Sequence, residues 1–253
     1  MKTWAIITGA GTGIGAALVK ELSKLNSFSI LALGRRIAPL EKTKSECENK
    51  DQVTVISADI SKNDDLQKIK SIISPEDNVK FLVQNAAVGL PDKLMDIKRE
   101  DFEYALAVNV TAPLLLSQMF LPQLSKCKGR IIHIGTGVAF NPQVGTSTYG
   151  ITKMAFHRLY TQLQVELKGT GAQIAMVLPG VVDTEGLWDH YDLAKKQELP
   201  HTAYFDQVKR EGKILSSEAS AKFLKYVMCD TSEEDFPKEW NANNESLWSL
   251  WKN

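Results

Sequence analysis

Short apolar runs alternate with stretches of helical periodicity along most of the chain. The runs are apolar on both faces, as strands buried in a parallel sheet must be. They cover Trp4–Thr8, Phe28–Leu33, Val53–Ser57, Val79–Val83, Arg130–Ile134 and Ile174–Leu178. Helices are predicted between them, over Ile14–Leu25, from about Pro39, over Asp101–Leu124 and over Tyr149–Lys168. This alternation predicts an α/β fold, a doubly wound parallel sheet with helices on both faces.

No repeat, low-complexity tract or linker interrupts this pattern, so residues 1–253 are expected to form a single domain. In the last predicted helix, apolar residues at four-residue spacing predict one stripe that faces either the core or a second copy of the chain. The stripe comprises Ile151, Ala155, Leu159, Leu163 and Leu167.

Composition narrows the classes of partner. The 30 Lys plus Arg balance the 30 Asp plus Glu, so we expect no basic face for nucleic acid or for an anionic membrane. No run approaches the roughly 18 apolar residues of a membrane span. Cys47, Cys127 and Cys229 lie far apart, and the four histidines form no ligand pattern, so neither a disulfide framework nor a metal site is expected. This cysteine usage favours a reducing, cytoplasmic compartment.

The first strand leads directly into the glycine-rich segment TGAGTGIG, Thr8 to Gly15, which opens a helix. Glycines at 9, 13 and 15 would let the backbone approach a pyrophosphate, whose charge then faces the unpaired amides of the helix N-terminus. The spacing is not a strict GxGxxG, and a merely flexible loop is the alternative. The strand, loop and helix context favours a Rossmann-like dinucleotide site.

Two arginines follow the second strand. A carboxylate at this point accepts a hydrogen bond from the ribose 2′-hydroxyl of NAD, whereas a cation pairs with the 2′-phosphate of NADP. The chain has Gly34, Arg35 and Arg36 here and no Asp or Glu. We therefore predict NADP(H) as cofactor, the alternative being that both arginines only solvate the strand end.

The segment YGITK places Tyr149 and Lys153 four residues apart, on one helical face. A nearby cation favours the phenolate, so Lys153 is expected to lower the pKa of Tyr149 and make it a general acid or base. Thr136 follows a predicted strand and could donate its hydroxyl to a substrate oxygen. Asn109, inside the long preceding helix, could hold a water by its amide.

Together these motifs resemble the short-chain dehydrogenase/reductase family over about residues 3 to 184. They stand in family order: TGAGTGIG, ADI at Ala58 to Ile60, QNAAV at Gln84 to Val88, Asn109, Thr136, YGITK and PGVVDT at Pro179 to Thr184. The resemblance implies reversible hydride transfer between a nicotinamide and a carbonyl or alcohol.

The resemblance also implies a role for each matching residue. Gly9, Thr12, Gly13 and Ile14 would line the pyrophosphate, Asp59 and Ile60 would flank adenine, and Asn85 and Ala86 would border the ribose. Lys153 would bind the nicotinamide ribose beside Tyr149, while Val182 and Thr184 would contact the carboxamide.

Within the family, the segments Phe140–Lys153 and Lys209–Leu224 are similar to the sepiapterin reductase and benzil reductase group. An NADPH-dependent carbonyl reductase acting on a ketone or α-dicarbonyl is thus implied. The chain departs from the family pattern in three places: Thr136 replaces serine, Ala87 replaces glycine, and the tail from Trp240 lacks the glycine-rich closing strand. The tail also has no clear counterpart of the C-terminal acidic residue that sepiapterin reductases use to hold the pterin, which argues against a pterin substrate.

The insertion Glu185–Leu215 should form a mobile lid, because ligands of such sheets bind beyond the carboxyl ends of the strands. Its aromatic residues suggest a flat or aromatic substrate, although two ordinary surface helices would also explain them. A homodimer is expected. The alternative function is an NADP(H)-binding sensor or scaffold that has lost turnover.

Overall fold

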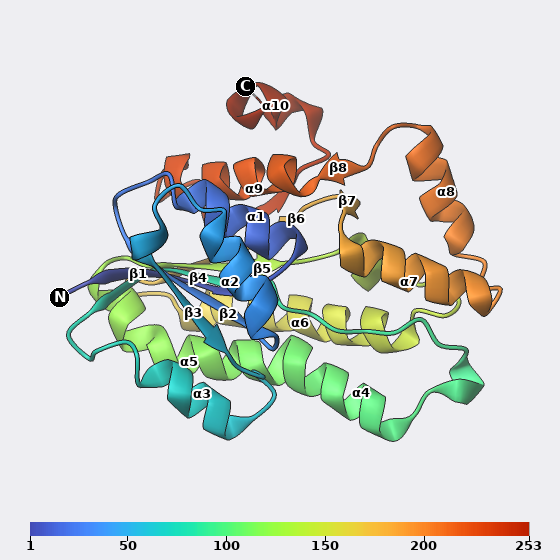
Figure 1. The fold of residues 1–253 in the computed structure, drawn as a ribbon, viewed down its shortest axis with the longest axis horizontal. Coiled ribbons are helices and arrows are strands. Elements are labelled where there is room, and N and C mark those ends of the chain that lie inside the picture. Colours follow the sequence, from blue (N-terminus) through green and yellow to red (C-terminus); the bar gives the residue numbers. More distant parts are fainter. Residues whose placement is uncertain (253) are drawn as a thin grey trace.

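The computed structural model describes residues 1–252, built around one seven-stranded sheet (Figure 1). Every pairing in this sheet is parallel. Its order is β3-β2-β1-β4-β5-β6-β9. The bounds are β1 (Thr3–Thr8), β2 (Ser29–Gly34), β3 (Val53–Ser57), β4 (Asn78–Gln84), β5 (Arg130–Ile134), β6 (Gln173–Leu178) and β9 (Glu239–Asn241). The predicted fold class is confirmed.

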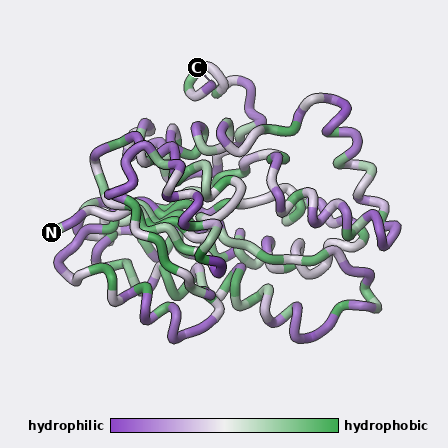
Figure 2. The backbone as a smooth tube through the Cα atoms, viewed as in Figure 1, coloured by the Kyte–Doolittle hydropathy of each residue, from purple (hydrophilic) through white to green (hydrophobic). Residues whose placement is uncertain are grey.

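Helices cover both faces of the sheet (Figure 1). Two clusters of buried apolar side chains separate the layers, and Figure 2 shows the strands as the apolar centre of the molecule. The helices packed on one face are α1 (Gly13–Leu22), α2 (Ile37–Ser45), α9 (Ser217–Lys225) and α10 (Trp248–Trp251). The helices on the other face are α3 (Asn63–Lys70), α5 (Ala112–Lys126) and α6 (Ser147–Glu166).

The strand order reverses beside β1, which pairs with β2 on one side and β4 on the other. A crevice opens at such a switch point, beyond the carboxyl ends of the strands. The residues that follow β1, β2, β4 and β5 therefore converge at one end of the sheet.

The tail lacks a glycine-rich closing strand, as expected, but a strand without glycine closes the sheet in its place. β9 pairs in parallel with β6, with Trp240 opposite Val177. Only Trp240 of this strand is buried, while Glu239 and Asn241 are exposed. Such a short strand with one apolar residue carries no recognisable pattern, and neighbouring β6 supplies the hydrogen bonds that define it.

The predicted stripe on α6 is confirmed only in its second half, where Leu159 packs on the core and Leu163 and Leu167 are buried. Residues four apart advance by about 400° around a helix, so a strict four-residue spacing drifts off one face. Ile151 at its start is exposed, and Leu163 near its end is buried. The face that enters the core instead carries Phe156, Tyr160 and Leu163.

A continuous helical stretch, Arg99–Lys126, is long and apolar enough to cross a membrane by length and composition alone. It comprises α4 (Arg99–Leu106), a π-helical turn (Ala107–Thr111) and α5. In its most apolar window 44% is buried within the protein. Leu116, Phe120 and Leu124 of this stretch belong to the core beneath the sheet, which accounts for its apolar character.

The insertion after β6 forms α7 (Glu185–Lys196) and α8 (Thr202–Arg210). Two short paired strands, β7 (Val182–Asp183) and β8 (Leu215–Ser216), hold its two ends together. Figure 1 shows α7 and α8 standing together beyond one end of the sheet.

Candidate active site

The glycine loop is bound to the end of β4 by a polar network. Thr8 Oγ1 accepts hydrogen bonds from the amides of Asn85 and Ala86, both at 3.0 Å. Asn85 Nδ2 donates back to the carbonyls of Thr8 and Gly9 at 2.9 and 3.2 Å. Gly9 has φ +67, and a Cβ there would lie 2.8 Å from Asn85 Nδ2. The close approach of loop and strand thus requires glycine at this position.

The N-terminus of α1 faces a cleft of about 320 Å³. No side chain caps this terminus, so its free amides remain available to an anion. Most of the predicted cofactor-binding residues line the cleft. They are Gly9, Thr12, Gly13, Ile14, Arg35, Arg36, Asp59, Ile60, Asn85, Ala86 and Thr184.

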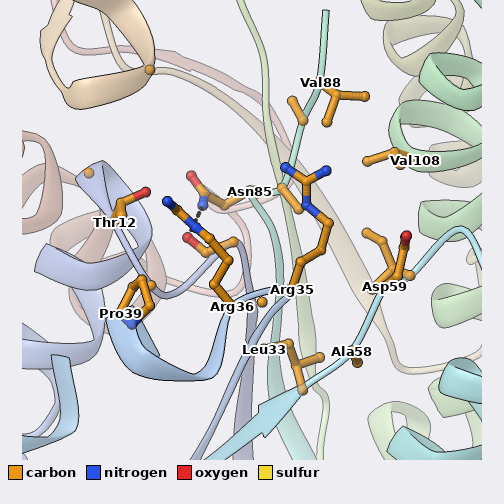
Figure 3. A pocket seen from close by; sticks show the side chains of 18 of the residues that line it. Thr12, Leu33, Arg35, Arg36, Pro39, Ala58, Asp59, Asn85, Val88 and Val108 are labelled. Atoms are coloured by element: carbon orange, nitrogen blue, oxygen red, sulfur yellow. Dashed lines mark hydrogen bonds between the residues drawn. The ribbon is translucent and has the colours of Figure 1, made fainter. Parts of the chain in front are cut away.

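Both predicted arginines extend from the end of β2 and line this cleft together with Thr12, Asp59 and Asn85 (Figure 3). Arg35 Nη1 donates to the Tyr104 hydroxyl at 3.0 Å. Arg36 Nη2 lies 3.7 Å from Glu185 Oε2 at the start of α7, an exposed contact. Two guanidinium groups, with the carboxylates of Asp59 and Glu185 near them, thus stand at this end of the cleft.

Sequence reasoning missed several residues of the cleft. Tyr104 lies on α4, and nothing in the sequence of α4 indicates that it approaches β2. The Tyr104 hydroxyl accepts a hydrogen bond from Arg35 and donates one to Asp59 Oδ2 at 3.4 Å. Some of the other missed residues could have been predicted, because they come directly after a strand, at the end of the sheet where the cleft lies. The missed lining residues are Gly11, Leu33, Gly34, Pro39, Ala58, Ala87, Val88, Tyr104, Val108 and Gly186.

Three other residues predicted to bind cofactor, Val182, Tyr149 and Lys153, lie outside this cleft lining. Lys153 is buried and its Nζ donates to the Ile134 carbonyl at 2.7 Å. This bond fixes the first turns of α6 against the end of β5. Tyr149 and Lys153 therefore stand at the same end of the sheet as the cleft.

The effect of Lys153 that was expected on the pKa of Tyr149 is outweighed by burial in this structure. Tyr149 keeps some exposure, yet burial raises the pKa of its phenol to about 12. Burial also lowers the pKa of Lys153 to about 7, and its Nζ lies 5.9 Å from the Tyr149 ring centroid. Tyr149 is consequently a neutral phenol throughout the physiological range, a state suited to donating a proton.

Asn109 lies in the π-helical turn and its amide is already engaged. Nδ2 donates to the Val88 carbonyl at 2.6 Å and to Thr152 Oγ1 at 2.9 Å, while Oδ1 accepts from the Val88 amide at 2.8 Å. Both Nδ2 hydrogens are used in these bonds, so the amide can hold a water only by accepting a hydrogen bond at the second lone pair of Oδ1. Its contacts join the segment that follows β4 to the first turns of α6, where Tyr149 stands.

Gly89 is a site residue that sequence reasoning missed. A Cβ at Gly89 would lie 2.7 Å from Tyr149 Cδ2 and 2.8 Å from Tyr149 Cβ. The Tyr149 ring therefore packs directly on the backbone of this segment. Only the tertiary approach of the two segments could have identified Gly89.

Thr136 caps a short 3₁₀ turn, Gly137–Ala139, that packs beside α6. Its Oγ1 accepts from the Val138 amide at 3.4 Å, which leaves the hydroxyl proton free for another acceptor. The ideal Cβ of Gly150 would lie 3.6 Å from the Val138 carbonyl oxygen, so this turn lies close to the residue after Tyr149.

Similarity to known proteins agrees with this geometry. The chain is 31% identical over 197 residues to an uncharacterised oxidoreductase of Staphylococcus epidermidis, covering 77% of this chain and 84% of the relative. It is also 31% identical over 186 residues to an NADP-dependent 3-hydroxy acid dehydrogenase of Schizosaccharomyces pombe, covering 71% of each chain.

Among solved structures, the KRED1-Pglu enzyme superposes with a TM-score of 0.83 at 21% identity, covering 94% of this chain and all of that one. A metagenomic short-chain oxidoreductase in complex with NADP superposes with a TM-score of 0.74 at 21% identity, covering 94% of this chain and 96% of that one. At this identity both show the shared fold. Residues 3–192 match the family described as short chain dehydrogenase. The chain therefore belongs to the short-chain dehydrogenase family.

Proposed function

We propose that this oxidoreductase is an NADPH-dependent carbonyl reductase in which Tyr149 donates the proton to the carbonyl oxygen. The observation that carries the proposal is the position of the Tyr149 phenol, whose ring packs on Gly89, directly after Val88 in the lining of a dinucleotide cleft that ends in two arginines. Reduction of a carbonyl requires a proton donor at its oxygen, and a neutral phenol supplies one.

The residues of the cleft fit an NADP-type dinucleotide. Gly9 and Gly13 have φ +67 and +54, and a Cβ would lie 2.8 Å from Asn85 Nδ2 at the first position and 2.9 Å from Thr184 Cγ2 at the second, so a side chain at either position would collide with residues that line the cleft. The uncapped α1 amides would face the pyrophosphate, and Arg35 and Arg36 would pair with the 2′-phosphate. The NADP dependence of the Schizosaccharomyces pombe relative supports the same choice.

NADPH, when bound, supplies the hydride. Tyr149 then holds the proton that the carbonyl oxygen takes up, and Thr136 donates a hydrogen bond to the same oxygen. Lys153 lies near Tyr149, and its ammonium uses one N–H to donate to the Ile134 carbonyl. Asp59 and Ile60 would flank the adenine, Asn85 and Ala86 the ribose, and Val182 and Thr184 the carboxamide.

The activity should depend on the hydroxyl of Thr136 and not on the shape of its side chain. Thr136→Ser keeps the donor and should retain activity, whereas the nearly isosteric Thr136→Val should lower kcat/KM by about 10-fold or more, since one hydrogen bond to a developing oxyanion is worth a few kcal/mol. Steady-state kinetics on both variants checks this. A fully active valine variant would assign Thr136 a packing role only.

For the substrate, we propose a ketone or α-dicarbonyl, in line with the resemblance to the sepiapterin and benzil reductase group. Trp188, Tyr191, Tyr204 and Phe205 on α7 and α8 support a flat substrate, because aromatic side chains can close an apolar pocket. A panel of α-diketones, quinones, aldehydes and sepiapterin tests this class by NADPH consumption. A 3-oxo acid belongs in the panel because of the Schizosaccharomyces pombe relative. Binding of NADPH without consumption of it by any carbonyl would favour the sensor alternative.

We also propose a homodimer formed through α5 and α6. The outer face of α6 exposes Ile151, Met154 and Val165, and Leu114 of α5 is exposed as well. Sedimentation velocity should give a dimer that Val165→Lys with Leu114→Lys converts to monomer, because buried charge is costly. Ile37→Lys, at an exposed apolar residue of α2, is the matched control. A monomeric unmodified protein at micromolar concentration would refute this interface.

A further inference from the structure

The first residue of α7 brings a carboxylate to the cofactor cleft. Glu185 stands between Thr184 and Gly186, which both line the cleft. Its Oε2 atom lies 3.7 Å from Arg36 Nη2, and this is the one ion pair that Arg36 forms within residues 1–252. The proposed function assigns the same guanidinium to the 2′-phosphate of NADP(H). One cation thus has two anions as candidate partners.

The backbone on both sides of this ion pair is anchored. Thr184 Oγ1 accepts from the Leu187 amide at 3.1 Å and so caps α7. A Cβ at Gly13 would lie 2.9 Å from Thr184 Cγ2, so the start of α7 packs directly on the glycine loop. Arg36 ends the segment after β2 as the N-cap residue of α2. Glu185 therefore stays within reach of Arg36 without any movement of the fold.

The Arg36–Glu185 pair is weak enough to be exchanged. The two side chains are 66% and 59% exposed, so water screens their charges and the single long contact contributes little. A phosphate monoester carries nearly two charges at neutral pH and can accept two parallel N–H bonds from a guanidinium. We expect the 2′-phosphate to displace the Glu185 carboxylate from Arg36.

This displacement opposes binding of the phosphate in two ways. The interaction between Arg36 and Glu185 is lost, and the displaced carboxylate, which stays on the first turn of α7, repels the phosphate beside it. Neither effect acts on a dinucleotide with a 2′-hydroxyl, because that dinucleotide leaves the ion pair in place. Glu185 should therefore weaken the binding of NADP(H) and not that of NAD(H).

Glu185 has an alternative role that needs no cofactor. It is the one acidic residue in the first turn of α7, where a negative charge interacts favourably with the helix dipole. That role would stabilise α7 whichever dinucleotide is bound. The two roles differ in whether the effect of Glu185 depends on the 2′-phosphate.

We propose that Glu185 is a specificity-determining residue of the cofactor site, whose carboxylate competes with the 2′-phosphate of NADP(H) for Arg36. It keeps the preference for NADP(H) below the value that Arg35 and Arg36 would give without it. The inference rests on the proposed pairing of Arg36 with the 2′-phosphate. It does not depend on the carbonyl substrate, because cofactor binding alone measures it.

Calorimetric titration with NADP⁺ and NAD⁺, which differ only in the 2′-phosphate, tests the competition. The quantity measured is the ratio of the two dissociation constants at low salt. Glu185→Gln should raise the preference for NADP⁺ about two- to five-fold, the range for an exposed ion pair, through tighter binding of NADP⁺ alone. Glu185→Lys should raise it further, to at least about ten-fold, because a cation then stands beside the phosphate. At high salt both increases should shrink.

Two controls separate the competition from a general effect of charge. Asp189→Asn removes the same charge from an exposed position one turn further along α7 and should leave the preference unchanged. When Arg36 is already replaced with glutamine, Glu185→Gln should raise the preference by less than about 1.5-fold, because the ion pair that the phosphate must break is gone.

The possible results distinguish the competition from the pairing on which it rests. A preference for NADP⁺ that Glu185→Gln does not raise, or an equal change in the binding of both dinucleotides, would overturn the competition alone. An undiminished increase in the absence of Arg36 would overturn it as well. An unmodified protein that binds NADP⁺ and NAD⁺ equally would refute both the pairing of Arg36 with the 2′-phosphate and the competition for it.

Discussion

Replacing Tyr149 with phenylalanine should lower kcat by about 10² to 10⁴-fold while leaving the fold and NADPH binding intact, the range typical of a positioned acid or base. The substitution removes only the hydroxyl and retains the ring that packs on Gly89. Steady-state kinetics, circular dichroism and NADPH fluorescence titration measure the three quantities.

Tyr160→Phe is the matched control. Tyr160 lies on the same helix, is buried, and its hydroxyl accepts a hydrogen bond from Gln164 rather than reaching the cleft. Its loss should change kcat by less than about two-fold, because no proton in the reaction passes through it. Retained turnover in a folded Tyr149→Phe protein would remove Tyr149 from the mechanism.

Cofactor preference should reverse when Arg35 is replaced with aspartate. The new carboxylate repels a 2′-phosphate and can accept from a 2′-hydroxyl. A charge-assisted contact is worth about 1.5 to 3 kcal/mol, so kcat/KM for NADPH should fall about 10 to 100-fold while that for NADH is maintained or rises.

Arg99→Asp makes the same charge change on exposed α4, where Arg99 pairs with Glu103, and should leave the preference unaltered. The cofactor preference should also be measured after substitution of Tyr104, because the Tyr104 hydroxyl accepts a hydrogen bond from Arg35 in the cleft. Equal kcat/KM for NADH and NADPH in the unmodified protein would contradict the assigned role of the arginines.

The parts of the fold that the sequence predicts are those governed by local pattern. Val53–Ser57 and Arg130–Ile134 were predicted with the bounds that the structure has, because buried parallel strands are continuous apolar runs. β9 could not be predicted, since one buried tryptophan between two exposed polar residues has no strand pattern of its own. The first half of the buried face of α6 was mispredicted because a four-residue spacing is not the period of a helix.

The candidate site divides in the same way. Glycine spacing and the arginines after β2 predict residues that line the cleft, because those motifs follow strand ends directly. Gly89 and Tyr104 reach their places through tertiary contacts between distant segments, which spacing does not encode. The pKa of Tyr149 is raised by burial of the phenol, and the four-residue spacing between Tyr149 and Lys153 in the sequence does not indicate how deeply the phenol is buried.

Transfer of deuterium from NADPH that carries deuterium at both C4 positions tests the central claim most directly. With the best carbonyl of the panel, mass spectrometry should find one deuterium on the former carbonyl carbon of the alcohol formed by the unmodified protein. Tyr149→Phe should form this product at least about 100-fold more slowly. An alcohol without deuterium, or no alcohol from any carbonyl in the panel, would contradict hydride transfer to a carbonyl by this protein.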